Sequence, residues 1–202
     1  SAGDRSSAVR ESLSVVVPTR DRAAMLGRCL DALRAELTDR DEIVVVDSAS
    51  ADPAAVAAVA NRAGVRLERC SHAGASLARN TGWRAASHQL VGFVDDDVRV
   101  RPGWAAALVA AFADPGVEFV TGRVVVPDDQ RDAERPVAVS SRTVRERLHP
   151  GLEGDLGASA NLGVRRPALE RVGGFDETLG PGSWAASAEA SVENRTENPA
   201  AS

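Results

Sequence analysis

The sequence has 202 residues and a formal net charge of −5, with 44% hydrophobic and 26% charged residues, which is typical of a soluble globular protein of one domain. Aromatic residues make up only 3% of it. The negative charge and the scarcity of aromatic side chains argue against nucleic-acid binding, whether through a basic surface or through base stacking. No apolar stretch reaches the ~18 to 20 residues that a membrane-spanning helix needs.

Short apolar runs alternate with amphipathic segments through the first half of the chain. The hydrophobic pattern predicts strands over 13–17, 42–46, 65–68 and 90–94, a longer strand over 117–126, and helices over 25–37, 53–62, 75–87 and 102–113. Asp52 followed by Pro53 predicts a helix start, and Gly64 predicts its end. This alternation indicates an α/β fold with a mostly parallel central sheet flanked by helices, whose ligands bind at the carboxyl ends of the strands.

The remaining segments are irregular. Residues 1–12 are small and polar and are expected to form a mobile leader. Residues 127–150 are charged and contain proline, which indicates a surface excursion, and 151–175 are glycine-rich with one short helix near 167–172. The last segment, 183–202, has no apolar period and is expected to be loose. Two isolated cysteines and the lack of a signal peptide favour a cytoplasmic protein.

Three aspartates follow the fourth predicted strand in the stretch VGFVDDDVRVRPGW. Side chains of an extended segment alternate in direction, so Asp95 and Asp97 are expected to converge on one cation while Asp96 points elsewhere. Hard divalent cations such as Mn²⁺ or Mg²⁺ take carboxylate oxygens as ligands. The alternative is a solvated acidic turn in which Asp97 or a neighbour caps the next helix.

Polar segments also follow the other strands. PTRDR after the first strand is either a helix cap, through Thr19 or Asp21, or a cradle for a nucleotide. DSASAD after the second strand ends in the predicted cap Asp52, while Asp47 could accept hydrogen bonds from a base or ribose. SLARNTG opens a helix and places Arg79 where it could meet phosphates. Because parallel strands end at one edge of a sheet, these segments are expected to lie together.

Five segments together resemble family-2 glycosyltransferases of the GT-A fold. They are SVVVPTRDR, EIVVVDSASAD, SLARNTGWRAA, VGFVDDDVRVRPGW and GASANLGVRRPALERVGGFDETLGPG, which cover most of the chain from Ser14 to Gly182 in the family's order. The resemblance implies inverting transfer of a sugar from a nucleoside-diphosphate sugar, UDP-sugar by default, to a hydroxyl of a sugar or glycoconjugate acceptor. Polysaccharide biosynthesis is the implied setting, and peripheral membrane association stays open.

The resemblance also assigns residues. It places Pro18, Thr19, Arg20, Asp47 and Arg79 around the donor nucleotide, Asp95 and Asp97 on the Mn²⁺ or Mg²⁺ ion as the ends of a DxD motif, and Asp96 near the ribose or sugar. It places Asn161, Gly174, Phe175 and Asp176 on the acceptor side. Residues 13–126 would then be the nucleotide-sugar-binding half, and 127–182 the acceptor-side segment of the same domain.

The sequence departs from the family at the general base. Family members continue into a Gly-Glu-Asp motif whose aspartate takes the acceptor proton, and here the matching stretch is SAEAS, with Glu189 followed by Ala190. Glu189 is therefore the candidate base, and Glu193 is a second one. A catalytically degenerate nucleotide-sugar-binding module is the alternative. A nucleotidyltransferase is disfavoured because the PTRDR loop contains no glycine.

Overall fold

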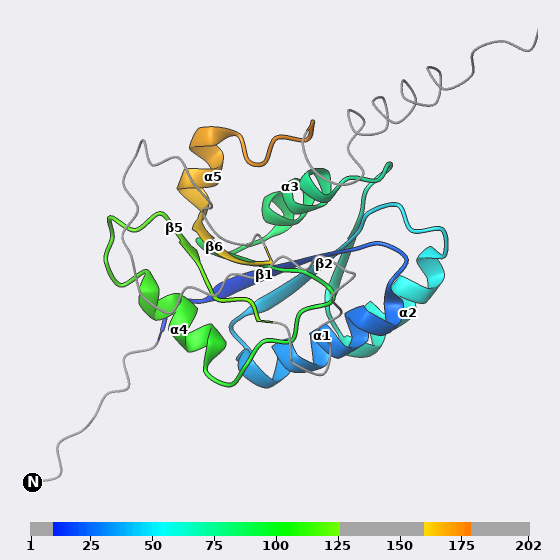
Figure 1. Cartoon of the computed structure of the whole chain (residues 1–202), viewed down its shortest axis with the longest axis horizontal. Helices are drawn as coiled ribbons and strands as arrows, with labels where there is room; N and C mark the ends of the chain where they lie inside the picture. The colour runs from blue at the N-terminus through cyan, green and yellow to red at the C-terminus, as the bar shows by residue number, and fades with distance from the viewer. Residues whose placement is uncertain (1–9, 126–159, 179–202) are drawn as a thin grey trace, which may run out of the picture.

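The computed structural model describes residues 10–125 and 160–178 (Figure 1). The strands in these residues are β1 (Leu13–Thr19), β2 (Glu42–Asp47), β3 (Arg66–Arg69), β4 (Leu90–Val94), β5 (Phe119–Thr121) and β6 (Asn161–Arg165). The helices are α1 (Ala23–Glu36), α2 (Pro53–Ala63), α3 (Ala75–Ala85), α4 (Trp104–Ala111) and α5 (Arg166–Val172). The predicted α/β fold is confirmed.

The strands form one mixed sheet in the order β3-β2-β1-β4-β6-β5. β1, β2, β3 and β4 are parallel, whereas β6 runs antiparallel to both β4 and β5. The strand order reverses between β1 and β4, which is the switch point where open α/β sheets bind their ligands. Thr19 pairs with Asp47 at the carboxyl ends of β1 and β2, and Asp95 follows the end of β4 at the same edge.

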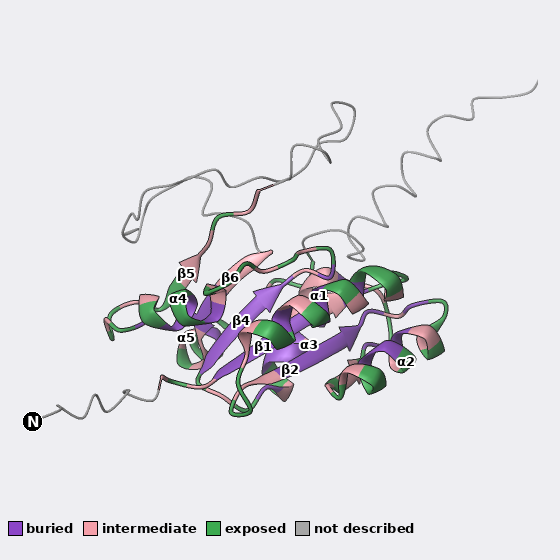
Figure 2. Ribbon diagram, turned by 90° about the horizontal axis from the view of Figure 1, so that it is seen from below, coloured by how far each residue is buried: buried purple, intermediate pink, exposed green. Residues whose placement is uncertain are grey.

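Helices cover both faces of the sheet, with α1, α2 and α4 on one side and α3 and α5 on the other (Figure 1). The central strands β1, β2 and β4 are buried almost throughout, as Figure 2 shows. Their β-branched runs serve both faces, since Val15 and Val17 pack toward α1 while Val16 packs toward α3. The carboxyl ends of these strands, which form the carboxyl edge of the sheet, therefore lie next to a core that is packed on both faces.

The local signals for α2 are confirmed. Asp52 accepts a hydrogen bond from the backbone N–H of Ala55 at 3.0 Å, Pro53 is the first helical residue, and Gly64 ends the helix in the left-handed conformation with φ 63°. The predicted short helix near 167–172 is also confirmed as α5, which ends at Gly173 with φ 83°.

Two sequence predictions were wrong. Of the long strand predicted over 117–126, the described residues up to 125 form only the three-residue β5, which pairs with Leu162–Val164 of β6, and residue 126 lies outside the described part of the chain. The glycine-rich region expected to be irregular contributes β6, which inserts between β4 and β5. Gly163 explains why that strand was missed: a side chain there would approach Leu108 of α4 to 2.7 Å, so close helix packing requires the glycine that weakens the strand pattern.

Of the expected leader, residues 1–9 lie outside the described part of the chain. Arg10 is described, and its guanidinium pairs with both carboxylate oxygens of Asp41 at 3.0 and 2.5 Å. The expected surface excursion and loose tail also lie outside the described residues, so they stay predictions.

Candidate functional site

A buried carboxylate joins β1 to the end of β4 at the switch point. Asp96 is 4% exposed, and its Oδ2 accepts a hydrogen bond from the Thr19 hydroxyl at 2.7 Å. Its Oδ1 accepts one from Arg22 Nη1 at 3.2 Å. Burial raises the pKa of Asp96, and the contacts with Thr19 and Arg22 offset only part of that effect. Asp96 therefore ties the two strands together rather than facing solvent.

The two flanking aspartates are more exposed and each contacts an arginine. The Asp95 Oδ1 lies 2.8 Å from Arg79 Nη2, and the Asp97 Oδ2 lies 3.3 Å from the same Arg22 Nη1 that contacts Asp96. Their side chains are 32% and 52% exposed, respectively. Two arginines thus offset the repulsion among three adjacent carboxylates. The pKa of Arg22 is raised, chiefly by its attraction to Asp96.

The helix-cap alternative for this turn is wrong. The N-cap of α4 is Gly103, in the left-handed conformation at φ 84°, and no side chain caps the helix. The three aspartates are thus not used as a cap for α4. They remain at the carboxyl edge, where their oxygens contact arginines from α3 and from the start of α1.

The chemistry of Asp95 and Asp97 fits a hard divalent cation. Both present partly exposed carboxylate oxygens, the ligands that Mn²⁺ and Mg²⁺ prefer. No group of three or more histidine, cysteine, aspartate or glutamate side chains in residues 10–125 and 160–178 gathers around a metal position. A cation held by these two carboxylates would therefore take further ligands from a bound diphosphate and water.

The loops after β1 and β2 are cross-linked to each other. Asp47 is 1% exposed, and its Oδ1 accepts a hydrogen bond from the Ser50 backbone N–H at 2.9 Å. The Ser50 hydroxyl in turn accepts one from the Asp21 backbone N–H at 2.9 Å, and the Asp21 carboxylate accepts one from the Ala51 backbone N–H at 2.7 Å. Arg69 places its Nε 3.7 Å from the other Asp47 oxygen.

Asp21 therefore does not cap α1, contrary to one sequence interpretation. The N-cap is Arg22, and it makes no side-chain cap hydrogen bond. Asp21 adopts φ 56°, a left-handed conformation that aspartate tolerates, and joins the loops instead. Pro18 lies in β1 opposite Val46, and Arg20 is exposed beside Asp21, with its Nε 3.7 Å from the carboxylate. Pro18, Arg20 and Asp21 thus all lie at the carboxyl end of β1 or directly after it.

On the other side of β4, Asn161 is the first residue of β6 and pairs with Val94. It therefore lies beside the strand end from which Asp95 continues. Its Oδ1 accepts a hydrogen bond from the Trp104 indole N–H at 2.9 Å, and its Nδ2 donates to the Arg123 carbonyl at 3.2 Å. The structure thus brings one predicted acceptor-side residue next to the predicted donor residues.

The predicted residues Gly174 and Phe175 pack against α3. The Phe175 backbone carbonyl accepts a hydrogen bond from Asn80 Nδ2 at 2.9 Å, and the Phe175 ring lies over Arg79. Asp176 is exposed and accepts hydrogen bonds from the Thr178 hydroxyl and backbone N–H, which lower its pKa. Glu189 lies outside the described residues, so its role stays a prediction.

Two site residues received no role from the sequence. Arg22 lies in PTRDR and Asn80 in SLARNTG, so both stand inside segments that pointed to the site. The sequence carried no signal for their contacts, because their partners lie 74 and 95 residues away along the chain.

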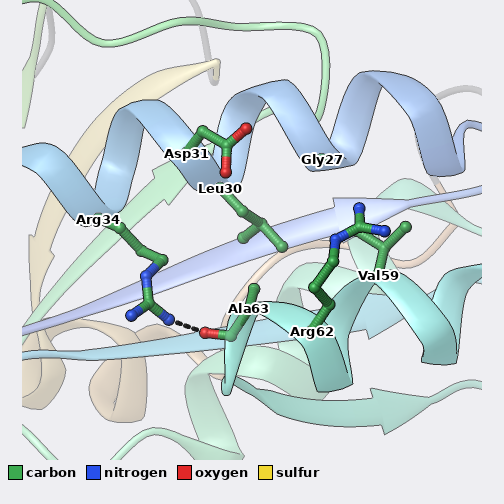
Figure 3. Close-up of a pocket in the computed structure, with 7 residues that line it drawn as sticks. All are labelled: Gly27, Leu30, Asp31, Arg34, Val59, Arg62 and Ala63. Carbon is green, nitrogen blue, oxygen red and sulfur yellow. Dashed lines mark hydrogen bonds between the residues drawn. The ribbon is translucent and has the colours of Figure 1, made fainter.

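A separate hollow lies between α1 and α2, as Figure 3 shows. Its volume is about 270 Å³, and it is lined by residues of Gly27–Arg34 and Val59–Ala63, with Arg34 donating a hydrogen bond to the Ala63 carbonyl. None of the predicted donor-site or acceptor-side residues lines it. The hollow is therefore distinct from the carboxyl-edge site.

The fold and the carboxyl-edge site define a protein of the GT-A class. A mannosyltransferase from Pyrobaculum calidifontis, solved with GDP-Man and Mn²⁺, matches with a TM-score of 0.65 and 25% identity over 87% of this chain and 50% of that chain. Staphylococcus aureus TarS 1–349, solved with UDP-GlcNAc, has a TM-score of 0.64 and shares the fold at 17% identity over 85% of this chain and 51% of its own.

The chain belongs to glycosyl transferase family 2, whose family model matches residues 14–173. The pre-mycofactocin glycosyltransferase of Mycobacterium tuberculosis is 34% identical over 180 residues, which are 84% of this chain and 37% of that protein. The glycosyltransferase AglE of Haloferax volcanii is 28% identical over 175 residues, 83% of this chain and 57% of that protein. The chain thus spans between about a third and about three fifths of the length of these relatives.

None of the helices within residues 10–125 and 160–178 combines the length and the apolar character needed to span a bilayer.

Proposed function

We propose that this chain forms the donor-binding part of an inverting, metal-assisted glycosyltransferase that transfers a sugar from a nucleoside-diphosphate sugar to an acceptor hydroxyl. One observation carries the proposal: Asp95, Asp96 and Asp97 lie at the switch point of the sheet with Arg22 and Arg79 in contact. Carboxylates and guanidinium groups side by side suit a diphosphate and its counter-cation. Family membership supports the same reaction class.

The nucleoside would lie against the ends of β1 and β2. Asp47 and Thr19 are paired at the ends of these strands, and Pro18 and Arg20 are the neighbours of Thr19 in the chain. The base stays open, because the structural relatives were solved with a guanosine and with a uridine nucleotide sugar. UDP is the default expectation, and the other nucleotides belong in the test.

In this proposal Asp95 and Asp97 would hold Mn²⁺ or Mg²⁺, which as a Lewis acid would stabilise the charge that develops on the departing diphosphate. Arg79 and Arg22 would bind the phosphate oxygens and orient the donor. The acceptor hydroxyl would attack the anomeric carbon from the face opposite the diphosphate, while a base takes its proton. Glu189 is the candidate base, and Asn161, Gly174, Phe175 and Asp176 would lie on the acceptor side.

A second candidate function is a nucleotide-sugar-binding module without catalysis. Ala190 favours it, because this residue stands where the family's general base is an aspartate. The module would bind a nucleoside diphosphate with Mn²⁺ but neither hydrolyse nor transfer the sugar. Donor hydrolysis assayed with Mn²⁺ on the wild type and on Glu189→Gln separates the two functions, since only the enzyme loses turnover in the variant.

Calorimetric titration with UDP, GDP and dTDP, with and without Mn²⁺, tests the shared part of both functions. Asp97→Ala should abolish the metal-dependent part of binding, because it removes one of two protein ligands of the ion. Asp39→Ala is the control, since it removes an equal charge from an exposed turn before β2. Equal metal-dependent binding by the Asp97 variant and the wild type would refute the metal site.

A further inference from the structure

Two consecutive residues of α3 contact the two sides of the site. Arg79 pairs with Asp95 on the proposed donor side, and Asn80 holds the segment 174–177 on the proposed acceptor side. Neighbouring residues of a helix point in directions about 100° apart, so one helix can reach both sides at once. The contacts of these two residues show how the sides are connected.

Asn80 uses its whole hydrogen-bonding capacity. It is 1% exposed, and its Nδ2 donates to the Phe175 carbonyl at 2.9 Å and to Glu177 Oε1 at 2.7 Å. Its Oδ1 accepts from the Phe175 backbone N–H at 2.9 Å and from the Trp83 indole N–H at 3.0 Å. An amide side chain has two donors and two acceptor lone pairs, so every one is satisfied. Asn80 therefore fixes both the position and the direction of the backbone at Phe175.

Gly174 makes this close approach feasible. Its φ is +93°, which side-chain-bearing residues rarely adopt, and a Cβ there would lie 2.3 Å from Asn80 Oδ1. The segment thus reaches the helix only because residue 174 has no side chain.

Phe175, held in this way, packs against two residues next to the proposed donor site, Phe93 of β4 and Arg79 of α3. Its ring meets the Phe93 ring edge-on at a centroid distance of 5.0 Å, and Phe93 precedes Asp95 by two residues on β4. The guanidinium carbon of Arg79 lies 5.9 Å from the Phe175 ring centroid, within the range of a cation–π contact. The Arg79 side chain is only 11% exposed and ends 2.8 Å from Asp95.

We propose that Asn80 and Phe175 are positioning residues through which the segment 174–177 holds Arg79 against Asp95, so that affinity for the metal–nucleotide donor depends on the acceptor-side segment. The inference rests on the proposed function, since it concerns the same donor site. It adds a physical connection between the two sides of that site. Disturbing the segment loosens Arg79 and the Asp95 carboxylate together.

The test measures calorimetric affinity for UDP, GDP or dTDP, whichever the wild type binds, at saturating Mn²⁺. Phe175→Leu keeps an apolar side chain but removes the ring face, and it should weaken binding by about three- to tenfold, the range of a partly desolvated cation–π contact. Asn80→Asp keeps the shape but replaces the donating amide group, and it should weaken binding to a similar degree. Asn61→Asp, the same change on the exposed surface of α2, should leave affinity unchanged.

The double variant and the thermal stability distinguish positioning from a purely structural role. Both residues act through Arg79, so their effects should not add. The Kd of the double variant, Asn80→Asp with Phe175→Leu, should be no more than about twofold above that of the single variant with the higher Kd. The inference would be overturned if the variants had a lowered Tm but wild-type nucleotide affinity at a temperature well below that Tm. It would also be overturned if the losses of binding free energy in the two single variants added up in the double variant. A wild type that binds none of the three nucleotides would overturn the proposed function as well, whereas wild-type binding with unaffected variants overturns this inference alone.

Discussion

Replacing Thr19 by valine tests the buried contact that joins β1 to the aspartate turn. Valine nearly preserves the shape of threonine, so the change removes the hydroxyl that donates to Asp96 Oδ2 at 2.7 Å and little else. Both residues are almost fully buried, with Thr19 3% and Asp96 4% exposed. A hydrogen bond to a charged buried group contributes about 1.5–3 kcal/mol, and Arg22 still contacts the other oxygen, so we expect a loss of about 2 kcal/mol at pH 7.

The loss should depend on pH in a defined direction. Burial already raises the pKa of Asp96, and losing the Thr19 hydroxyl raises it further because only the ionised form gains the full strength of that bond. The ionised carboxylate therefore costs more in the variant at every pH above its folded pKa. As the pH falls below the pKa of the variant and then of the wild type, Asp96 becomes neutral in both, and the difference in stability shrinks.

Urea unfolding from pH 7 down to pH 4 measures this difference directly. Thr19→Ser is the matched control, since it keeps the hydroxyl and loses one methyl group, so its smaller effect should not change with pH. A loss below about 0.5 kcal/mol for the valine variant, or one that stays constant with pH, would show that Asp96 does not depend on this hydrogen bond.

Two further predictions concern the packing of α3 on the sheet and an ion pair at the amino ends of β1 and β2. Gly82→Ala would place a Cβ 2.2 Å from a Val16 methyl and 3.1 Å from a Val46 methyl. Although alanine favours helix formation, this overpacking should lower the free energy of unfolding by about 2 kcal/mol. An unchanged free energy of unfolding in urea would contradict this prediction. Burial alone raises the pKa of Asp41, but hydrogen bonds, led by those from Arg10, hold it below the usual 3.8. The stability that the ionised Asp41 contributes is present above that pH and is lost as the pH falls through the lower folded pKa. Arg10→Ala should therefore lower the free energy of unfolding at pH 7 and lower it less at pH 3. Equal losses of unfolding free energy at the two pH values would refute the pairing.

Much of the fold could be predicted from local pattern. The β-branched runs at Leu13–Val17 and Glu42–Val46 are buried on both faces of the sheet, so they read as continuous apolar strands, and Asp52-Pro53 and Gly64 carry the stereochemistry of helix ends. β6 could not be predicted in this way. Its NLGVR sequence becomes a strand because β4 and β5 supply partners on both sides and α4 packs over Gly163.

The order of the elements from β1 to α4 and the placing of polar segments at the ends of the parallel strands were thus determined by the sequence alone, because both follow from periodicity and from the parallel direction of neighbouring strands. Only the tertiary structure decided that Arg22 pairs with Asp96 and Asp97, that Arg79 pairs with Asp95, and that Asn80 holds Phe175. Apart from Arg79 and Asp95, 16 residues apart, these partners are separated by 74 to 95 residues. Their contacts depend on how the packed sheet and α3 bring distant loops together, and no local propensity encodes that arrangement.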